Sequence, residues 1–450
     1  MRQALQPRVH SWLDRHATAP GPLALACSGG SDSLALLHLT ASWAKARDRA
    51  LLVLTVDHGL RPEAAAETRS VAEIAAQLGA ACEILHWTSA KPQTGLQAAA
   101  RQARHRLLAE ACQAVGARDL LLGHTLDDQA ETVWMRLQAG GNWRSLTGMA
   151  PVSRSPVWPE GRDVRLLRPL LDTRRETLQA WLRERGQAWV EDPSNQDTAY
   201  TRIRIRQRLG ALEAGGFDPS RLAALGGDLQ DIQQAEDLSA ALLARRTVSL
   251  TAWGGAQLDR AAFQAAAPAV RYRVWEALVL ALSGVPGLPD RRALARLDAQ
   301  LAQKGRVTAA GTLLDVSDKA VWLVRDPGAV LGRVDHAAGD RLSGPVHAPV
   351  WDGRFALQAV PSSVTPGVLG KDYAGLEDRA CLDGIPGFAR SGLLCLRREG
   401  RVIGLAGVPS AGDEGGNIRP LFLHRFCTRL LPAQPPVWFD TSESLQPVLQ

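Results

Sequence analysis

Small, acidic and hydroxyl-bearing residues gather in a loop that could hold a phosphorylated ligand. The segment SGGSDS, at residues 28–33, follows an apolar run at residues 23–27 and leads into a helical pattern at residues 32–47. Its glycines let the backbone approach a ligand closely, and a helix start offers unpaired N–H groups and a positive dipole end. We therefore predict a phosphate or pyrophosphate site, with a ligand-free turn as the alternative. The predicted contacts are Ser28, Gly29, Gly30, Ser31, Asp32 and Ser33.

This loop differs from the common glycine-rich motifs. The chain contains no GxxxxGK[ST] segment and no GxGxxG segment after a predicted strand. The loop nearly matches the nucleophile elbow GxSxG, but Ser33 stands where the last glycine belongs. The sequence therefore argues against the usual nucleoside-triphosphate loop, a dinucleotide fold and a serine hydrolase.

A second group of reactive residues lies in the segment GHTLDDQAET, at residues 123–132. Its carboxylates stand three or four residues apart, so they share one face of a predicted helix at residues 126–137. Thr125 and Asp128 also fit a helix capping box, which explains part of the group structurally. Three carboxylates and a histidine exceed what capping needs, and they could hold magnesium, bind an amine or remove a proton. The candidate residues are His124, Asp127, Asp128 and Glu131.

Two further segments carry polar side chains that a ligand could use. Asp57 and His58 follow an apolar run at residues 51–56, and they could contact a ligand or cap the next helix. Later in the chain, the segment EDPSN at residues 191–195 precedes four arginines within seven residues. This concentration of positive charge suits polyphosphate or a nucleic-acid backbone, although a solvated basic face is its usual meaning. The four arginines are Arg202, Arg204, Arg206 and Arg208.

The elements predicted around these segments alternate between strand and helix. Strands are predicted at residues 23–27, 51–56, 82–87 and 119–123, and helices at residues 32–47, 63–78, 96–115 and 126–137. This alternation indicates βαβ units and a parallel, doubly wound α/β sheet. Right-handed crossovers then place the ligand crevice at the carboxyl ends of the strands, where the motifs stand.

The remaining chain predicts two smaller domains. We expect residues 1–212 to form the α/β domain that carries these motifs, residues 213–330 a mostly helical domain, and residues 331–450 a small β-rich domain. The segment at residues 213–220 reads as a linker, and residues 326–349, rich in Gly, Pro and His, mark the second boundary. Alternating apolar residues at 307–324 predict a hairpin.

Composition excludes several classes of protein. The 450 residues are 46% hydrophobic and 22% charged, values typical of globular domains, and no apolar run approaches the roughly 18 residues of a membrane span. Six scattered cysteines without a CxxC pair argue against a zinc ribbon, an iron–sulfur cluster or a disulfide scaffold, and they suit a reducing cytoplasm. The net charge of +6 permits a nucleic-acid partner without requiring one.

Taken in order, the segments SGGSDS, VDHGLR, GHTLDDQAET and EDPSN with its arginines resemble the tRNA(Ile)-lysidine synthetase family of PP-loop ATP pyrophosphatases. The resemblance implies that ATP adenylates the C2 oxygen of the wobble cytidine in a CAU-anticodon tRNA(Ile). The ε-amine of free L-lysine then attacks C2 and expels AMP, which leaves lysidine. Similarity to longer relatives also implies that the middle domain grips the tRNA.

The resemblance assigns a role to each group of residues. The SGGSDS loop would hold the departing pyrophosphate with Mg²⁺, and Asp57 and His58 would help to position the nucleotide. The acidic group and His124 would orient lysine and accept its proton. Arg206, with Arg202, would stabilise charge on the phosphate or position the cytidine, and Arg204 and Arg208 would contact the tRNA.

The chain departs from the family pattern at two places. Relatives usually carry Arg-Asn-x-Ile-Arg where this chain has Arg202-Ile-Arg-Ile-Arg206, so Ile203 replaces a polar residue. Residues 139–145 depart as well, because relatives usually carry an arginine directly before the first glycine of this loop, which is Gly140 here, and this chain does not. Two alternatives stay open: another PP-loop enzyme that modifies tRNA, for example by thiolation, and a non-catalytic nucleotide- or RNA-binding protein. The absence of CxxC argues against thiolation, and the carboxylates Asp127, Asp128 and Glu131 argue against a protein that only binds.

Overall fold

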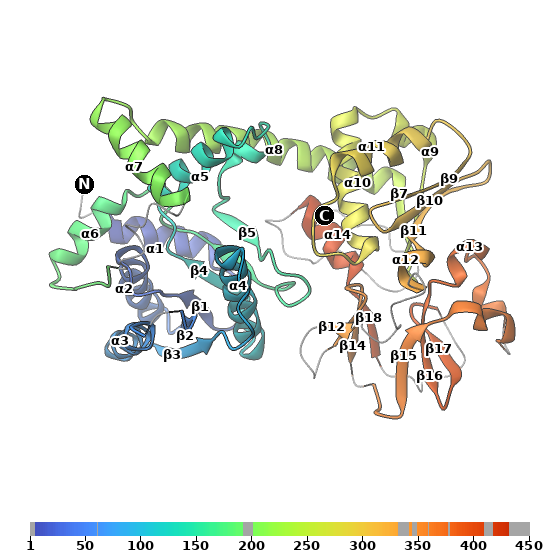
Figure 1. Ribbon diagram of the computed structural model, residues 1–450, viewed down its shortest axis with the longest axis horizontal. Coiled ribbons are helices and arrows are strands. Elements are labelled where there is room, and N and C mark those ends of the chain that lie inside the picture. Colours follow the sequence, from blue (N-terminus) through green and yellow to red (C-terminus); the bar gives the residue numbers. More distant parts are fainter. Residues whose placement is uncertain are drawn as a thin grey trace. The chain divides into compact units, whose positions relative to one another are not determined.

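The computed structural model describes residues 5–60, 62–191, 201–331, 342–343, 349–358, 360–376, 379–408 and 417–431 (Figure 1). The chain divides into two compact units, Met1–Gln234 and Ala235–Gln450, and the division falls within helix α8 (Ser220–Thr247). Of the predicted EDPSN segment, only Glu191 lies within the described residues, and most of the predicted boundary at 326–349 lies outside them. The three-domain division stays a prediction.

A six-stranded sheet forms the centre of the first unit, with the strand order β3-β2-β1-β4-β6-β5. All neighbouring strands run parallel except the edge strand β5, which is antiparallel to β6. The strands are β1 (Leu23–Ala26), β2 (Leu51–Asp57), β3 (Ala81–His86), β4 (Asp119–Leu122), β5 (Val152–Arg154) and β6 (Arg165–Leu167). The four predicted strands are confirmed, whereas β5 and β6 were not predicted.

Helices cover both faces of this sheet, as a doubly wound fold requires. Successive residues of β1 point to opposite faces, so Leu23 and Leu25 pack in one apolar cluster and Ala24 and Ala26 in another. The first cluster includes residues of α1, α2, α3 and α6, and the second includes residues of α4. These helices are α1 (Leu5–His16), α2 (Ser31–Ala46), α3 (Ala64–Gln77), α4 (Leu96–Ala114) and α6 (Arg175–Arg183). Burial on both faces explains why β1 carries no polar residue.

Two further helices complete the first unit near the carboxyl ends of the strands. Helix α5 (Leu126–Gln138) follows β4, and α7 (Thr201–Ala214) packs against it through Ile205 and Leu209, which contact Ala130 and Val133 in one buried cluster. The arginine-rich segment is therefore helical, and its apolar residues fix it to the helix that carries the acidic group.

The second unit combines helices with three antiparallel sheets. Its five-stranded sheet has the order β7-β8-β11-β10-β9, and a four-stranded and a three-stranded sheet follow. The predicted hairpin at 307–324 is confirmed as part of β9 (Gly305–Ala309), β10 (Thr312–Val316) and β11 (Val321–Arg325). The other strands are β7 (Val248–Leu250), β8 (Gly255–Leu258), β12 (Leu342–Ser343), β13 (Val350–Trp351), β14 (Phe355–Gln358), β15 (Val364–Val368), β16 (Leu394–Arg398), β17 (Arg401–Leu405) and β18 (Asn417–Pro420).

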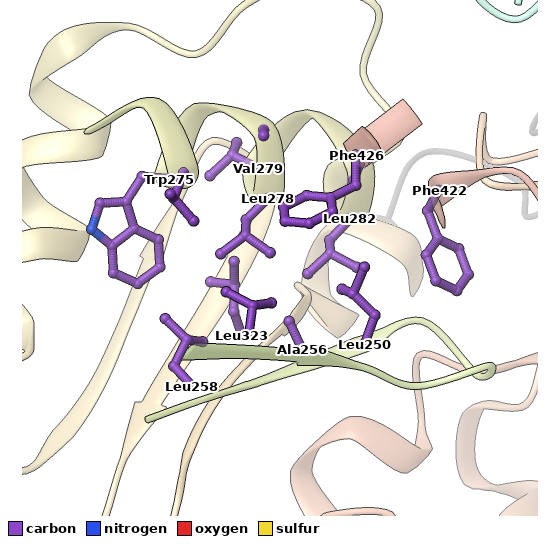
Figure 2. Close-up of a cluster of buried hydrophobic side chains, with 14 of the residues drawn as sticks. Leu250, Ala256, Leu258, Trp275, Leu278, Val279, Leu282, Leu323, Phe422 and Phe426 are labelled. Carbon is purple, nitrogen blue, oxygen red and sulfur yellow. The ribbon is translucent and has the colours of Figure 1, made fainter. Parts of the chain in front are cut away.

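The largest apolar core of this unit connects helices with residues of all three sheets, and a second apolar cluster contains Ala389 of α13 and part of the three-stranded sheet. Figure 2 shows Trp275 and Leu278 of α10 facing Leu258 and Leu323 of the five-stranded sheet, with Phe426 of α14 beside them. The helices are α9 (Arg260–Gln264), α10 (Pro268–Ser283), α11 (Arg291–Gln300), α12 (Pro327–Leu331), α13 (Gly387–Arg390) and α14 (Phe422–Leu430). Among the helices that the structure describes, none combines the length and the apolar composition that crossing a bilayer would need.

Candidate functional site

A pocket of about 630 Å³ opens at the carboxyl ends of β1 and β4 in the first unit. It lies between the predicted phosphate loop, the segment after β4, the start of α6 and the first turns of α7. Nine of the residues predicted from the sequence line it, namely Ser28, Gly30, Ser31, Asp32, Ser33, His124, Asp128, Arg202 and Arg206. The phosphate loop and α7, about 180 residues apart in the chain, therefore meet at the carboxyl ends of the strands, which is where an α/β fold has its ligand crevice.

Hydrogen bonds within the phosphate loop hold its backbone in a curled shape. Ser33 Oγ accepts from the Ser28 backbone N–H at 3.2 Å and donates to Gly30 O at 3.0 Å. Gly29 has φ +83°, which side chains rarely allow, and its carbonyl accepts from Val190 N at 2.9 Å. Because Gly30 is the N-cap of α2, the first turn of that helix faces the pocket. This arrangement suits an anion.

The segment after β4 approaches this loop very closely at Gly123. A Cβ atom at this position would lie 3.0 Å from both N and Cα of Ser33. Only a glycine allows the backbone to pass here without displacing the first turn of α2. The contact sets the distance between the phosphate loop and the acidic residues that follow Gly123.

Asp128 acts in the cap of α5 and also faces the pocket. Its Oδ2 accepts from the backbone N–H of Thr125 at 2.8 Å, and its own N–H donates to Thr125 Oγ1, so the predicted capping box is confirmed. Its Oδ1 lies 2.8 Å from a guanidinium nitrogen of Arg202 and 3.1 Å from one of Arg175. Burial would raise the pKa of Asp128, but the two guanidinium groups outweigh it and hold this pKa below its ordinary value. The side chain is thus a carboxylate suited to binding a cation.

Glu131 fixes the two pocket-facing arginines of α7. Its carboxylate is 3% exposed, and its two oxygens lie 2.7 Å from Arg202 Nε and 2.8 Å from Arg206 Nε. The spacing of four residues puts these arginines on one face of α7. Arg204 and Arg208 are exposed on the helix instead, and Ile203 is buried in the pocket wall. The departure from the family pattern at Ile203 therefore places an apolar side chain beside the ligand space.

Asp127 points away from the pocket and supports α6. Its Oδ2 accepts from the backbone N–H of Arg175 at 2.7 Å, and its Oδ1 lies 3.1 Å from Arg174 Nε. These contacts give Asp127 a structural role at the start of α6. Of the two neighbouring aspartates, Asp128 is the one in contact with the ligand space.

Arg175 and Arg104 also line the pocket, and the sequence reasoning missed both. The Arg175 guanidinium contacts Asp32 and Asp128, whereas the described residues offer Arg104 no hydrogen bond or ion pair. Burial lowers the pKa of the Arg104 guanidinium. A buried guanidinium without a partner among the described residues suits an anionic ligand.

A smaller pocket of about 170 Å³ adjoins this site, since His124 and Arg104 line both. The Nδ1 atoms of His58, His105 and His124 are buried and lack a hydrogen-bond partner among the described residues. Burial lowers the pKa of His105 to about 4 and that of His124 to about 3, so both rings are neutral near pH 7. The lining residues are His58, Ala100, Arg101, Arg104, His105, Leu122 and His124. Guanidinium groups and neutral imidazoles together suit a small polar anion.

Two further predicted segments lie outside the larger pocket. Asp57 Oδ1 accepts from Gly59 N at 2.8 Å and its Oδ2 is 3.6 Å from His86 Nδ1, so this carboxylate shapes the loop after β2. The segment at residues 139–145 contacts α5, because Arg136 of that helix donates to Ser145 O at 2.9 Å. The Trp143 ring is exposed, and the Arg144 guanidinium lies over it, 4.9 Å from the ring centre.

Comparison with known proteins gives a consistent result. Residues 2–213 match the PP-loop domain family. The tRNA(Ile)-lysidine synthase of Caulobacter vibrioides is 36% identical over 93% of this chain and 96% of its own length. That of Hyphomonas neptunium is 42% identical over 63% of this chain and 75% of its own length. The solved U34-tRNA thiolase NcsA from Methanococcus maripaludis, with its [4Fe-4S] cluster, overlaps 51% of this chain and 78% of its own, at 17% identity and a TM-score of 0.43.

The match to the Caulobacter relative spans both units and nearly the whole of each chain. The match to the PP-loop domain family, over residues 2–213, includes the phosphate loop, Asp128 of α5 and the arginines Arg202 and Arg206 of α7, which the structure gathers around one pocket. The chain belongs to the tRNA(Ile)-lysidine synthase family.

Proposed function

We propose that this protein ligates free L-lysine to C2 of the wobble cytidine in CAU-anticodon tRNA(Ile), with cleavage of ATP to AMP and pyrophosphate. The observation that carries the proposal is the pocket itself, where a phosphate loop faces a carboxylate, Asp128, across one ligand space. A site for an anion and a site for an amine thus adjoin, as a reaction between an adenylated base and lysine requires. Because tRNA acts in the cytoplasm, the proposal implies a cytoplasmic enzyme.

The phosphate loop would bind the nucleotide through its backbone and hydroxyl groups. Ser28, Ser31 and Ser33 line the pocket beside the first turn of α2, and Arg206 faces the same space. Fixed N–H groups and guanidinium groups stabilise the charge that develops on a departing pyrophosphate. The wobble cytidine, once adenylated, would then carry AMP as the leaving group.

Magnesium fits the donor atoms of this pocket. Mg²⁺ in nucleotide sites is usually held by one or two carboxylates together with phosphate oxygens, and both Asp32 and Asp128 line the pocket. Among the described residues, no three His, Cys, Asp or Glu side chains are placed to hold a metal by themselves. When bound with ATP, the ion would supply positive charge to the phosphates.

We assign lysine to the smaller pocket and the adjoining edge of the larger one. Its volume of about 170 Å³ suits one amino acid, and Arg101 and Arg104 could pair with the α-carboxylate. From there the side chain would pass His124, so that the ε-ammonium reaches Asp128. His124 Nδ1 has no hydrogen-bond partner in the described part of the chain and could accept the proton, because the charge of a nearby phosphate raises the pKa of an imidazole.

The exposed side of α7 would contact the tRNA backbone. Arg204 and Arg208 lie on this side, while Arg202 and Arg206 face the pocket. The helix could therefore bind RNA phosphates on one face and the reacting nucleotide on the other, as the spacing of its arginines favours.

The test is incorporation of labelled lysine into a tRNA(Ile) transcript with a CAU anticodon, with ATP and Mg²⁺ present. The control transcript carries uridine in place of the wobble cytidine. We expect incorporation into the first transcript alone, with AMP and pyrophosphate released in equal amounts. ATP-dependent modification of this tRNA without lysine would instead indicate another PP-loop chemistry, and binding without any turnover would indicate a non-catalytic protein.

A further inference from the structure

Arg175 lies where the N-termini of two helices meet. It is the first residue of α6, and its backbone N–H donates to Asp127 Oδ2 at 2.7 Å. The chain just before it is fixed as well, because Leu126 N at the start of α5 donates to Thr173 O at 3.0 Å. The base of the Arg175 side chain is therefore tied to the first turn of α5 at two points.

The Arg175 guanidinium connects the phosphate loop with the acidic residues of α5. Its Nε lies 2.8 Å from Asp32 Oδ2, and one terminal nitrogen lies 3.1 Å from Asp128 Oδ1. The other terminal nitrogen lies 3.7 Å from Glu131 Oε1. Among the ion pairs of the described residues, those of Arg202 and Arg206 reach α5 alone, so Arg175 is the single cation that contacts both sides.

We infer that Arg175 is a positioning residue, which fixes the separation and orientation of the Asp32 and Asp128 carboxylates across the pocket. It would thereby align a nucleotide at the phosphate loop with an amine at Asp128. This inference rests on the proposed function, since that reaction needs both ligands in register. The Arg175 side chain is 20% exposed and lines the pocket, so its contacts form part of the wall around the reacting groups.

The planar shape of a guanidinium is essential to this role. Its donors point in fixed directions and can contact two carboxylates at once, whereas a lysine ammonium is a single point charge on a flexible stem. Charge matters too, because burial raises the pKa of Asp32 and Arg175 opposes that rise. Removing the guanidinium would leave Asp32 and Asp128 facing each other without the cation between them.

The experiment compares full-length Arg175→Ala and Arg175→Lys with the matched control Arg174→Ala. Arg174 is the neighbouring residue, and it pairs with Asp127 at 3.1 Å and Glu213 at 2.8 Å but does not line the pocket. For each variant we would measure the thermal unfolding midpoint, the kcat for lysidine formation, and the KM values for lysine and ATP. Methylguanidine would then be added to both alanine variants.

We expect the kcat of Arg175→Ala to fall about 100-fold, with smaller changes in both KM values, because misaligned reactants lose rate more than affinity. Arg175→Lys should stay nearly as slow. Added methylguanidine should raise the kcat of Arg175→Ala about tenfold and leave the kcat of Arg174→Ala unchanged, since only the first variant loses a guanidinium from the pocket. Arg174→Ala itself should keep a kcat close to that of the wild type.

Three outcomes would overturn the inference. They are a kcat of Arg175→Ala equal to that of the control, wild-type kcat in Arg175→Lys, and no effect of methylguanidine on a folded Arg175→Ala protein. If Arg175→Ala does not fold, the folded Arg175→Lys variant decides alone, by its rate. Absence of lysidine in the wild-type reaction would instead overturn the proposed function, and the positioning role with it, so the two failures are distinguishable.

Discussion

Replacing Gly123 by alanine tests whether the distance between the phosphate loop and α5 controls activity. The added Cβ would lie 3.0 Å from N and Cα of Ser33 and 3.1 Å from C of Asp32. All three are backbone atoms, so no side chain can rotate to relieve the contact. The first turn of α2 must therefore move away from the segment that leads into α5.

The size of this movement follows from the contact distances. Ordinary carbon contacts begin at 3.4 Å, so the two backbones must separate by about 0.4 Å. Overpacking of this kind costs about 1–3 kcal/mol of unfolding free energy. Because a misplacement of about 1 Å can cost about 100-fold in rate, a shift of this size should lower kcat about tenfold.

The assay combines urea unfolding with the lysine-incorporation rate, and Gly227→Ala serves as the control. Gly227 lies inside α8, and a Cβ added there would meet no atom within 4 Å outside the neighbouring backbone of the helix itself. Alanine should therefore raise the unfolding free energy by about 0.5–1 kcal/mol and leave kcat unchanged. A Gly123→Ala protein with wild-type stability and wild-type kcat would refute the reasoning. A loss of stability without loss of rate would show that the distance between loop and helix does not control the chemistry.

Three further predictions concern charge. Asp128→Asn should lower kcat at least about 100-fold and leave tRNA binding largely intact, because it removes the carboxylate opposite the phosphate loop; unchanged turnover would exclude a catalytic role. Burial lowers the pKa of His105 from 6.5 to about 4. As the pH falls below 6.5, this imidazole is therefore protonated in the unfolded chain before it is protonated in the folded protein. The unfolding free energy should then fall as the pH drops from 6.5 to about 4. The effect should be on the order of 2 kcal/mol, and urea titrations of His105→Asn should lack it. Arg204→Ser and Arg208→Ser should each reduce the slope of log affinity for tRNA against log salt by about 1 and leave kcat unaffected; an unchanged slope would remove α7 from the RNA interface.

Much of the sheet could be predicted from the sequence because its strands and helices have strong patterns. The ends of β1–β4 and of α2–α5 lie within two residues of the predicted ends, since buried apolar runs and helical spacing are local signals. Strands β5 and β6 have three residues each, too few for any alternation to be recognised. The pairing of β6 depends on β4, which offers Leu120 and Leu121 as partners for Leu166 and Leu167, and β5 in turn pairs with β6.

The candidate site was predictable only where local spacing determines it. The capping box at Thr125 and the shared face of Asp128 and Glu131 follow from residue spacing alone. Arg175 does not, because nothing in the local sequence distinguishes it from Arg174. The two differ only in tertiary contacts, since Arg174 reaches Glu213 and Arg175 reaches Asp32.

The charges of the pocket explain how one site could bind a polyanion and an amine together. The carboxylates of Asp32, Asp128 and Glu131 pair with the guanidinium groups of Arg175, Arg202 and Arg206. The lining residues Arg104 and Glu191 add one charge of each sign, so the ligand-free site is close to neutral. Cations alone would bind ATP, but they would repel the lysine ammonium. Carboxylates alone would bind lysine, but they would repel the phosphates. With both kinds of group present, phosphates could pair with Arg206, and an ammonium or a metal ion could then take the place of that guanidinium beside a carboxylate. The net charge of the pocket stays small both with and without its ligands. Ion pairs that are partly removed from water seldom add much stability, so we infer that the ion pairs of this pocket serve the exchange of partners.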